Sequence, residues 1–188
     1  MAYDSARAKV VVFGGYDGSS YLQDTWEWDG ALGTWTDRTP AVKPSARQGH
    51  TIAYDSARAK VVLFGGIDGS LKQDTWEWDG ALGTWTDRTP AGAKPSNRNN
   101  TAMAYDPSRD FTVMFGGADV PISDHGPPTL FGDTWLLGTA VPNISQQPEC
   151  QTARAGQPIT LSVTATGTAP LTYHWQKNSA NLTDSARI

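Results

Sequence analysis

The stretch QDTWEWDGALGTWTDRTPA occurs twice in this chain of 188 residues, at Gln23–Ala41 and again, without a change, at Gln73–Ala91. A second stretch, AYDSARAKVVVFGG, lies at Ala2–Gly15 and recurs with one exchange at Ala53–Gly66. A degraded third copy, AYDPSRDFTVMFGG, lies at Ala104–Gly117. The copies are about 50 residues apart. A fixed period of that length is typical of propellers and solenoids, in which each repeat forms one small sheet.

The composition indicates a β-rich protein. Charged residues make up 18% of the chain, and there are 19 Gly, 12 Pro and eight Trp, a pattern of few charges and many turn formers. The net charge of −4 gives no basic footprint for nucleic acid or for an anionic membrane surface. No apolar run is long enough to span a bilayer. The single cysteine, Cys150, cannot form an internal disulfide, so it does not identify a redox compartment.

Four short strands are predicted within one repeat. His50–Tyr54 and Asp74–Asp79 alternate between apolar and polar residues, as half-buried strands do. Lys60–Phe64 is a nearly continuous apolar run, which predicts a strand covered on both faces. Thr84–Arg88 is the last strand, with Trp85 pointing inward. Four antiparallel strands in a repeating unit form the blade of a β-propeller.

The repeat resembles the kelch repeat, over residues 1–138. In the third unit Arg98 is kept, but Asn100 stands where the motif has a histidine. The first unit lacks most of its first strand and the third lacks its last, so about three blades are expected. The features that carry the resemblance are a diglycine after an apolar strand (Gly14–Gly15, Gly65–Gly66, Gly116–Gly117), a tryptophan pair (Trp26 and Trp28, Trp76 and Trp78), a fourth-strand tryptophan (Trp35, Trp85) and an Arg-x-Gly-His opening at Arg47–His50.

The pattern changes after residue 138. Residues 139–148 (TAVPNISQQP) have the composition of a linker, and residues 149–188 resemble the first half of a bacterial immunoglobulin-like domain. Ile159–Ala165 alternates as a strand, and the resemblance gives Trp175 the role of the core tryptophan. The segment departs from the family at the disulfide, because Val163 or a neighbour stands where the first bridging cysteine would be. We expect an all-β chain: a partial propeller followed by an incomplete immunoglobulin-like sandwich.

The tryptophans and the paired carboxylates could bind a ligand or catalyse a reaction, but a structural role in the blades explains their positions better. The tryptophans could form a sugar-stacking platform, but their strand spacing favours core packing. Glu27 with Asp29, and Glu77 with Asp79, could be the carboxylate pair of a glycosidase. Both pairs recur with the blades, with the glutamate expected to be exposed on a strand and the aspartate in a turn, so a structural role is favoured over catalysis.

No metal site or cofactor is predicted. The histidines, His50, His125 and His174, do not share a metal-ligand spacing. Galactose oxidase, a copper-radical enzyme, is a kelch propeller, and resemblance to it would require a cysteine joined to a tyrosine and two histidine ligands. The blades here contain no cysteine. A non-enzymatic protein is therefore expected. The alternative is an extracellular carbohydrate-active enzyme or copper-radical oxidase whose catalytic residues lie outside this sequence.

The resemblance implies a ligand surface made of the loops between second and third strands (Tyr16–Gln23, Ile67–Gln73, Ala118–Gly132) and the segments joining blades (Ala41–Arg47, Ala91–Arg98). Function generally lies in loops on a rigid scaffold. These segments are also where the copies differ most, although drift in unconstrained loops would have the same effect. The candidate ligand-binding residues are Tyr21, Lys72, Asp124 and His125 at the loop tips, with Arg47 and Arg98 nearer the channel.

The predicted function is binding or display. The combination of propeller and immunoglobulin-like module resembles secreted or cell-surface bacterial proteins, with a protein or carbohydrate as the ligand of the propeller loops. About three blades, two of them incomplete, fall short of the 4–8 that close a propeller. Met1 is followed at once by sequence from the middle of a repeat, so the sequence is expected to be a piece of a longer protein. Since open sheet edges pair with other chains, it is expected to associate through its open blade edges.

Overall fold

In the computed structural model of the chain, the residues described are 1–119, 128–137, 143–149 and, between 151 and 181, residues 151–152, 154, 156–157, 160–166, 173, 175–177 and 180–181. Their regular elements are β-strands, which confirms the predicted all-β class. The chain divides into two compact units, Met1–Gly138 and Thr139–Ile188.

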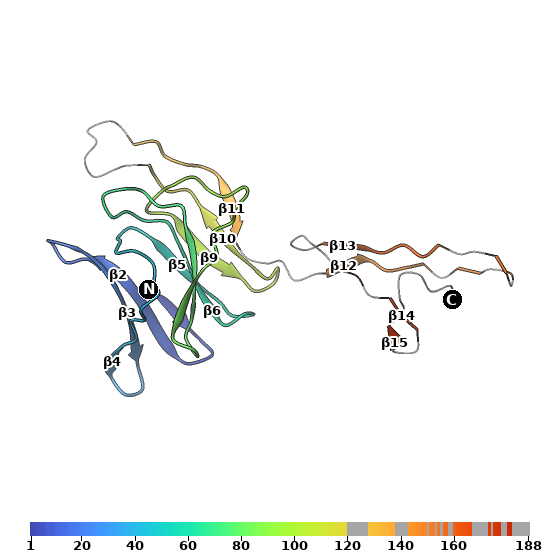
Figure 1. Ribbon diagram of the computed structural model, residues 1–188, viewed down its shortest axis with the longest axis horizontal. Coiled ribbons are helices and arrows are strands. Elements are labelled where there is room, and N and C mark those ends of the chain that lie inside the picture. Colours follow the sequence, from blue (N-terminus) through green and yellow to red (C-terminus); the bar gives the residue numbers. More distant parts are fainter. Residues whose placement is uncertain are drawn as a thin grey trace. The chain divides into compact units, whose positions relative to one another are not determined.

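Three antiparallel sheets, here called blades 1 to 3, make up the first unit (Figure 1). Blade 1 contains β1 (Ala2–Asp4), β2 (Lys9–Tyr16), β3 (Tyr21–Asp29) and β4 (Thr34–Asp37). Blade 2 contains β5 (Thr51–Asp55), β6 (Lys60–Phe64), β7 (Thr75–Asp79) and β8 (Thr84–Asp87). Blade 3 contains β9 (Ala102–Asp106), β10 (Phe111–Phe115) and β11 (Thr134–Leu137). Each is an up-and-down meander, and among the described residues blade 3 has three strands, as predicted.

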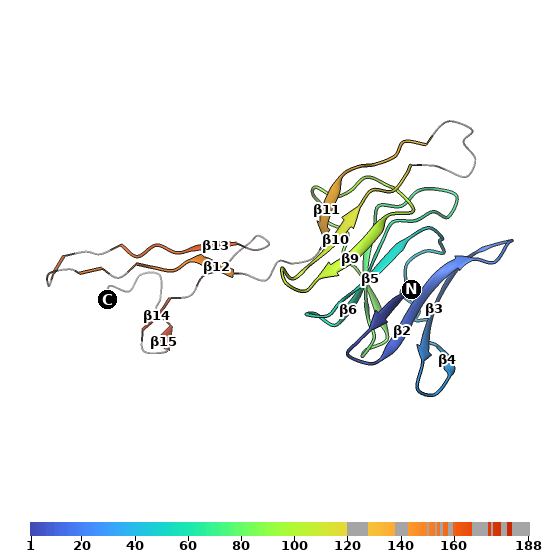
Figure 2. The same ribbon diagram turned by 180° about the vertical axis from the view of Figure 1, so that it is seen from behind.

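Blade 2 lies between blades 1 and 3, in Figure 1 and from behind in Figure 2. Its strand β6 is covered on both faces, as the apolar run predicted. Val61 and Leu63 belong to the core shared with blade 1, and Phe64 belongs to the core shared with blade 3. All three side chains are buried, and so is Val62. The middle blade therefore has no solvated face at its centre.

The two faces of a blade are different, and the strand register defines them. On one face Trp78 of β7 lies opposite Val61 and opposite Trp85 of β8; we call this the tryptophan face. The other face of a blade carries a valine and a phenylalanine of its second strand, which in blade 1 are Val11 and Phe13. We call this second face the phenylalanine face.

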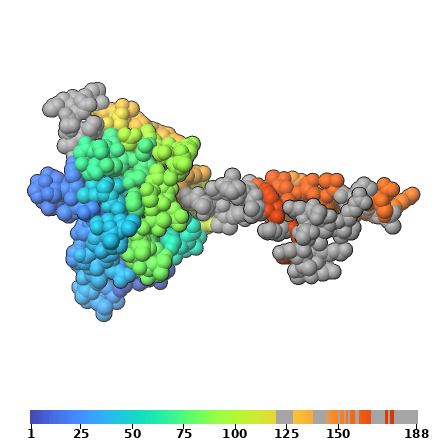
Figure 3. All heavy atoms as spheres, in the orientation of Figure 1, coloured from blue at the N-terminus to red at the C-terminus, as the bar shows by residue number. Residues whose placement is uncertain are grey.

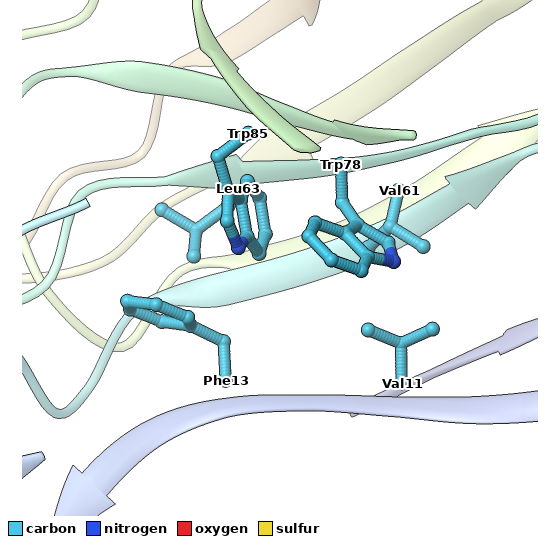
Figure 4. Packing of buried hydrophobic residues seen from close by; sticks show 6 residues of the cluster. All are labelled: Val11, Phe13, Val61, Leu63, Trp78 and Trp85. Carbon is cyan, nitrogen blue, oxygen red and sulfur yellow. The ribbon is translucent and has the colours of Figure 1, made fainter. Parts of the chain in front are cut away.

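The tryptophan face of blade 2 packs on the phenylalanine face of blade 1. Figure 4 shows the rings of Trp78 and Trp85 pointing toward Val11 and Phe13. The Phe13 and Trp85 rings meet edge to face with their centroids 5.2 Å apart, a favourable aromatic geometry. The Trp85 indole Nε1 donates a hydrogen bond of 2.9 Å to Thr25 Oγ1. The predicted core role of these tryptophans thus corresponds to packing between blades.

The diglycine Gly65–Gly66 lies where the segment that joins blade 2 to blade 3 passes close to the backbone of blade 2. Gly65 has φ +67° and Gly66 has φ +97°, backbone conformations that L side chains rarely adopt. A Cβ at Gly65 would also lie 2.5 Å from the carbonyl oxygen of Arg98. Glycine is therefore required both by the backbone angle and by the closeness of the segment that leads into blade 3.

The structure corrects the predicted alignment of the third copy of the Arg-x-Gly-His motif, which placed Asn100 at the histidine position. Thr101, rather than Asn100, takes the place of His50, because Thr101 lies against Gly117 as His50 lies against Gly66. Asn100 occupies the glycine position of the motif, with φ 53°. Asparagine tolerates this left-handed conformation better than most residues.

The described residues of the second unit include four short strands. β12 (Asn143–Gln146) pairs with β13 (Thr164–Thr166), and β14 (Gln176–Lys177) pairs with β15 (Ala180–Asn181). β12 lies in the segment whose composition predicted a linker. Trp175, which the resemblance placed in a core, is 39% exposed. None of the described residues belongs to a helix long and apolar enough to cross a membrane.

Candidate binding surface

Backbone hydrogen bonds bring the predicted loops and the blade-joining segments together. The Arg47 N–H donates to the Leu22 carbonyl at 2.9 Å, and the Gly15 N–H donates to the Arg47 carbonyl at 2.9 Å. The same pattern recurs one blade further on, where the Arg98 N–H donates to the Lys72 carbonyl at 2.9 Å. Each connection thus runs beside the hairpin of the preceding blade, and the loops share one end of the sheets.

The side chain of each of these arginines reaches forward into the next blade. The Arg47 guanidinium is buried and binds both carboxylate oxygens of Asp74 at 2.6 and 2.7 Å, and it also donates to the Gly65 carbonyl at 2.9 Å. Burial would raise the pKa of Asp74, but the paired Arg47 holds it below its usual value. Arg47 therefore joins blade 1, through its backbone, to blade 2, through its side chain.

Arg98 repeats this arrangement between blades 2 and 3. Its guanidinium is buried, binds the Asp133 carboxylate and lies 3.9 Å from the centroid of the Phe131 ring. Its hydrogen bonds lower the pKa of Asp133 to about 2. A ligand at this surface would meet the loops before it met either of the two arginines. The proposed ligand role of Arg47 and Arg98 stays a prediction, and the structure gives both a joining role.

The loop-tip candidates are placed differently from one another. Tyr21 lies in β3, and its ring contacts the Tyr16 ring at a tilt of 50°, with centroids 5.3 Å apart. The Lys72 ammonium forms an ion pair of 2.8 Å with Asp68, within its own loop. Asp124 and His125 lie outside the described residues. The structure therefore brings Tyr21 and Lys72 to the same end of adjacent blades.

Tyr16 is a candidate that the sequence analysis missed. Its side chain is 48% exposed, and its hydroxyl donates to the Gly18 carbonyl at 3.0 Å. In blade 2 the equivalent Ile67 is buried instead. The signal was present in the sequence, since the loop Tyr16–Gln23 has a tyrosine near each end.

The recurring glutamates were wrongly expected to be exposed. Glu27 and Glu77 are buried, because the face of the sheet that carries them is covered by the next blade. Glu27 accepts hydrogen bonds from the Arg7 guanidinium at 2.6 and 3.0 Å and from Trp78 Nε1 at 3.3 Å. Arg58 forms an ion pair with Glu77 in the same way. Each glutamate is therefore held by an arginine inside a junction between blades.

His50 lies in the junction between blades 1 and 2. Its ring meets the Phe13 ring edge to face at 5.6 Å. Burial, and after it the charge of Arg47, lowers the pKa of His50 to about 4, so the ring is neutral at pH 7. Across the part of the chain that the structure describes, no group of three histidine, cysteine or carboxylate side chains could hold a metal ion.

A hollow of about 530 Å³ lies away from the loops, on blade 1. It is lined by residues of the β1–β2 and β3–β4 turns, among them Arg7 and Gly30, and of the adjoining strand ends, among them Tyr3 and Trp28. In a meander these turns lie at the opposite end of the sheet from the β2–β3 hairpin. The hollow is therefore separate from the candidate ligand surface.

A comparison with known protein families supports the assignment of the three sheets as kelch blades. A family model described as the KLHDC2/KLHL20/DRC7 kelch-repeats domain matches residues 1–168, which extends past Gly138 into the segment with the immunoglobulin-like resemblance. A search of curated proteins found no match. Kelch repeats commonly mediate protein–protein interaction and are generally non-catalytic binding modules. Because the matched residues make up most of the chain, the protein belongs to the kelch-repeat family.

Proposed function

We propose that the chain is a non-enzymatic recognition scaffold whose β2–β3 hairpin and neighbouring loops bind a protein or carbohydrate ligand. One observation carries this proposal: Tyr16 and Tyr21 form an aromatic pair on blade 1, with their rings in contact and tilted by 50°, and Tyr16 is exposed. Tyrosine supplies a large, rigid and amphipathic contact surface and is enriched at binding hot spots. The nearly identical blade 2 has no aromatic pair at this end.

The scaffold beneath the pair supports the proposal. In blade 1 the ladder between β2 and β3 extends past the diglycine to the pair Tyr16 and Tyr21. In blade 2 the regular ladder stops at Phe64 opposite Thr75. The two tyrosines are thus presented by a paired hairpin, and a rigid support lowers the entropy lost when a ligand binds.

A binding screen tests this function. The chain would be screened against a glycan array and against cell-surface proteins, and then compared with a Tyr16→Ser/Tyr21→Ser variant. We expect the variant to lose at least tenfold in affinity for the ligand found, with a nearly unchanged melting midpoint. Leu82→Ser, an exposed change in the β7–β8 turn, is the matched control and should bind normally. Equal binding by the double variant would contradict the proposal.

A loop graft locates the surface independently. Replacing Ala118–Gly132 by the sequence of Ile67–Gln73 changes a loop and leaves the strands intact. Loss of binding with retained stability would extend the ligand surface to blade 3 and to the predicted residues Asp124 and His125. Binding that survives both the graft and the tyrosine changes would place the ligand on another part of the chain.

The proposal extends to where the protein is found, outside the cell or at its surface. We infer a secreted or cell-surface bacterial protein in which residues 149–188 form an immunoglobulin-like spacer. The alternating sequence of Ile159–Ala165 and the resemblance to such modules support this inference. Fractionation of expressing cells, with protease treatment of intact cells, tests it. Protection of the chain from external protease in intact cells, with none of it in the medium, would contradict a surface location.

A further inference from the structure

The first unit has two exposed blade faces that differ in kind. The tryptophan face of blade 1 carries Trp28 and Trp35, and Trp35 is 51% exposed. The phenylalanine face of blade 3 carries Phe115 and Leu136, which are 53% and 59% exposed. These faces lie on the outer sides of the first and the last blade. The blue atoms of blade 1 lie along one edge of the unit in Figure 3.

The protein already contains a junction between two faces of these kinds. The tryptophan face of blade 2, with the same tryptophans as that of blade 1 and Leu63 in place of Val12, is buried on the phenylalanine face of blade 1. Its contacts include the Phe13 and Trp85 rings, the hydrogen bond from Trp85 Nε1 to Thr25, and the packing of Trp78 with Val11. Trp78 Nε1 also donates a hydrogen bond to Glu27 there.

Blade 3 keeps the residue types that receive the tryptophans in that junction. The equivalents of Val11, Phe13 and Thr25 are Val113, Phe115 and Thr134. The strand register places Thr134 directly opposite Phe115, and Leu136 directly opposite Val113. Leu136 replaces Glu27, so this face of blade 3 has more apolar surface than the face that blade 2 covers.

A glycine and an arginine provide a second, independent correspondence. Gly80 of blade 2 is buried beneath the Arg7 guanidinium of blade 1, where a Cβ would lie 1.9 Å from an arginine nitrogen. The equivalent Gly30 is exposed and lines the hollow of about 530 Å³. The blade 3 equivalent of Arg7 is Arg109, which is 70% exposed. The hollow beside Gly30 therefore corresponds to the place that an arginine of the preceding blade fills at the inner junction.

We propose that a second copy of this chain docks on these faces, the tryptophan face of blade 1 in each copy packing on the phenylalanine face of blade 3 in the other. Such a head-to-tail contact made twice around a two-fold axis closes on itself. Two copies of three blades form a ring of six, which is within the range of 4–8 blades found in propellers. The proposal is independent of the ligand at the loops.

Solution mass and two charge substitutions test the closed pair. Light scattering coupled to size-exclusion chromatography should give twice the mass of the chain. Trp35→Glu and Phe115→Glu place a charge on one face each and should each give a monomer, with a dissociation constant at least a hundredfold higher. Both side chains are exposed, so circular dichroism should show the native fold in both variants. Leu82→Glu, equally exposed in a turn, should remain a dimer.

Mixing the two variants distinguishes head-to-tail docking from the alternatives. Each variant retains the face that the other has lost, so the mixture should regain a dimer with one intact contact, weaker than the unsubstituted pair. A tryptophan face that packs on its own copy would leave Phe115→Glu dimeric and would overturn the proposal. So would a wild-type chain that stays monomeric at hundreds of micromolar, or one that forms species growing with concentration instead of a closed pair.

Discussion

Blades 1 and 2 share nineteen consecutive residues, Gln23–Ala41 and Gln73–Ala91, yet the same side chains lie in opposite environments. Trp85 is 3% exposed and Trp35 is 51% exposed. The register between the third and fourth strands is the same in both blades. The difference in exposure therefore comes from the neighbouring blade, which covers Trp85 and leaves Trp35 in water. Burial in this fold is decided by stacking between repeats, and the two blades form a natural matched pair for measuring what stacking contributes.

The largest difference should come from the fourth-strand tryptophans. Trp85→Ala removes a buried ring and should lower the free energy of unfolding by about 3–5 kcal/mol. Trp35→Ala removes the same ring from an exposed site and should cost less than about 1 kcal/mol. Urea denaturation at concentrations that keep the chain monomeric measures both. Equal costs would mean that stacking does not determine the role of these rings.

Acid should loosen the junction between blades 1 and 2. His50 has a pKa of about 4 in the folded protein and 6.5 as its ordinary value. The unfolded chain therefore binds more protons between those values, and the free energy of unfolding should fall by roughly 3 kcal/mol as the pH drops from 6.5 to 4. In His50→Gln this fall should disappear. The equivalent Thr101 does not titrate, so a pH effect that persists in the variant would assign it to another group.

The next effect concerns the threonine on each phenylalanine face. Thr25→Val leaves the buried Trp85 N–H without its acceptor and should cost about 1–3 kcal/mol. Thr75→Val should be nearly neutral, because the Thr75 hydroxyl has no hydrogen-bond partner among the described residues. Thermal melts of the two variants, side by side, measure the difference. A larger cost at Thr75 would imply a donor reaching it from blade 3.

The smallest effect should come from the turn glycines. Gly80→Ala forces a methyl group against the Arg7 guanidinium and should cost about 1 kcal/mol, at the lower end of overpacking because the arginine can shift. Gly30→Ala meets no neighbouring blade and should be neutral or stabilising by up to about 1 kcal/mol, through the unfolded chain. Calorimetry of the two variants gives the sign of each change, and a cost at Gly30 equal to that at Gly80 would refute this explanation.

The sequence was sufficient to predict the blades because their signals are local. The apolar run Lys60–Phe64 and the alternation around Trp78 depend on strand geometry alone, and both strands formed as predicted. Glu27 was misjudged because its burial depends on the neighbouring blade, which strand periodicity does not reveal. The place of Thr101 could be predicted from spacing alone, because Thr101 follows Arg98 by three residues as His50 follows Arg47. The asparagine at the glycine position obscured this correspondence.

The candidate surface was only partly predictable. The grouping of the loops followed from the meander, whereas the joining role of Arg47 depends on Asp74, which is 27 residues further along the chain. Tyr16 was overlooked because its importance comes from an extended hairpin that blade 2 does not share. The strand β12 formed within a segment whose composition alone favoured a linker, since four residues are too few to give a periodic signal.

Identical blades also create a problem of self-recognition during folding. Strand β7 could pair with β2 instead of β6, because the two partner strands are nearly the same. The native connection between Phe64 and Thr75 is short, and the non-native loop from Phe13 would be several times longer. Closing that longer loop should cost roughly 1–2 kcal/mol more. Chain connectivity, rather than any difference in the side chains, is therefore what selects the correct partner and limits strand exchange between repeats.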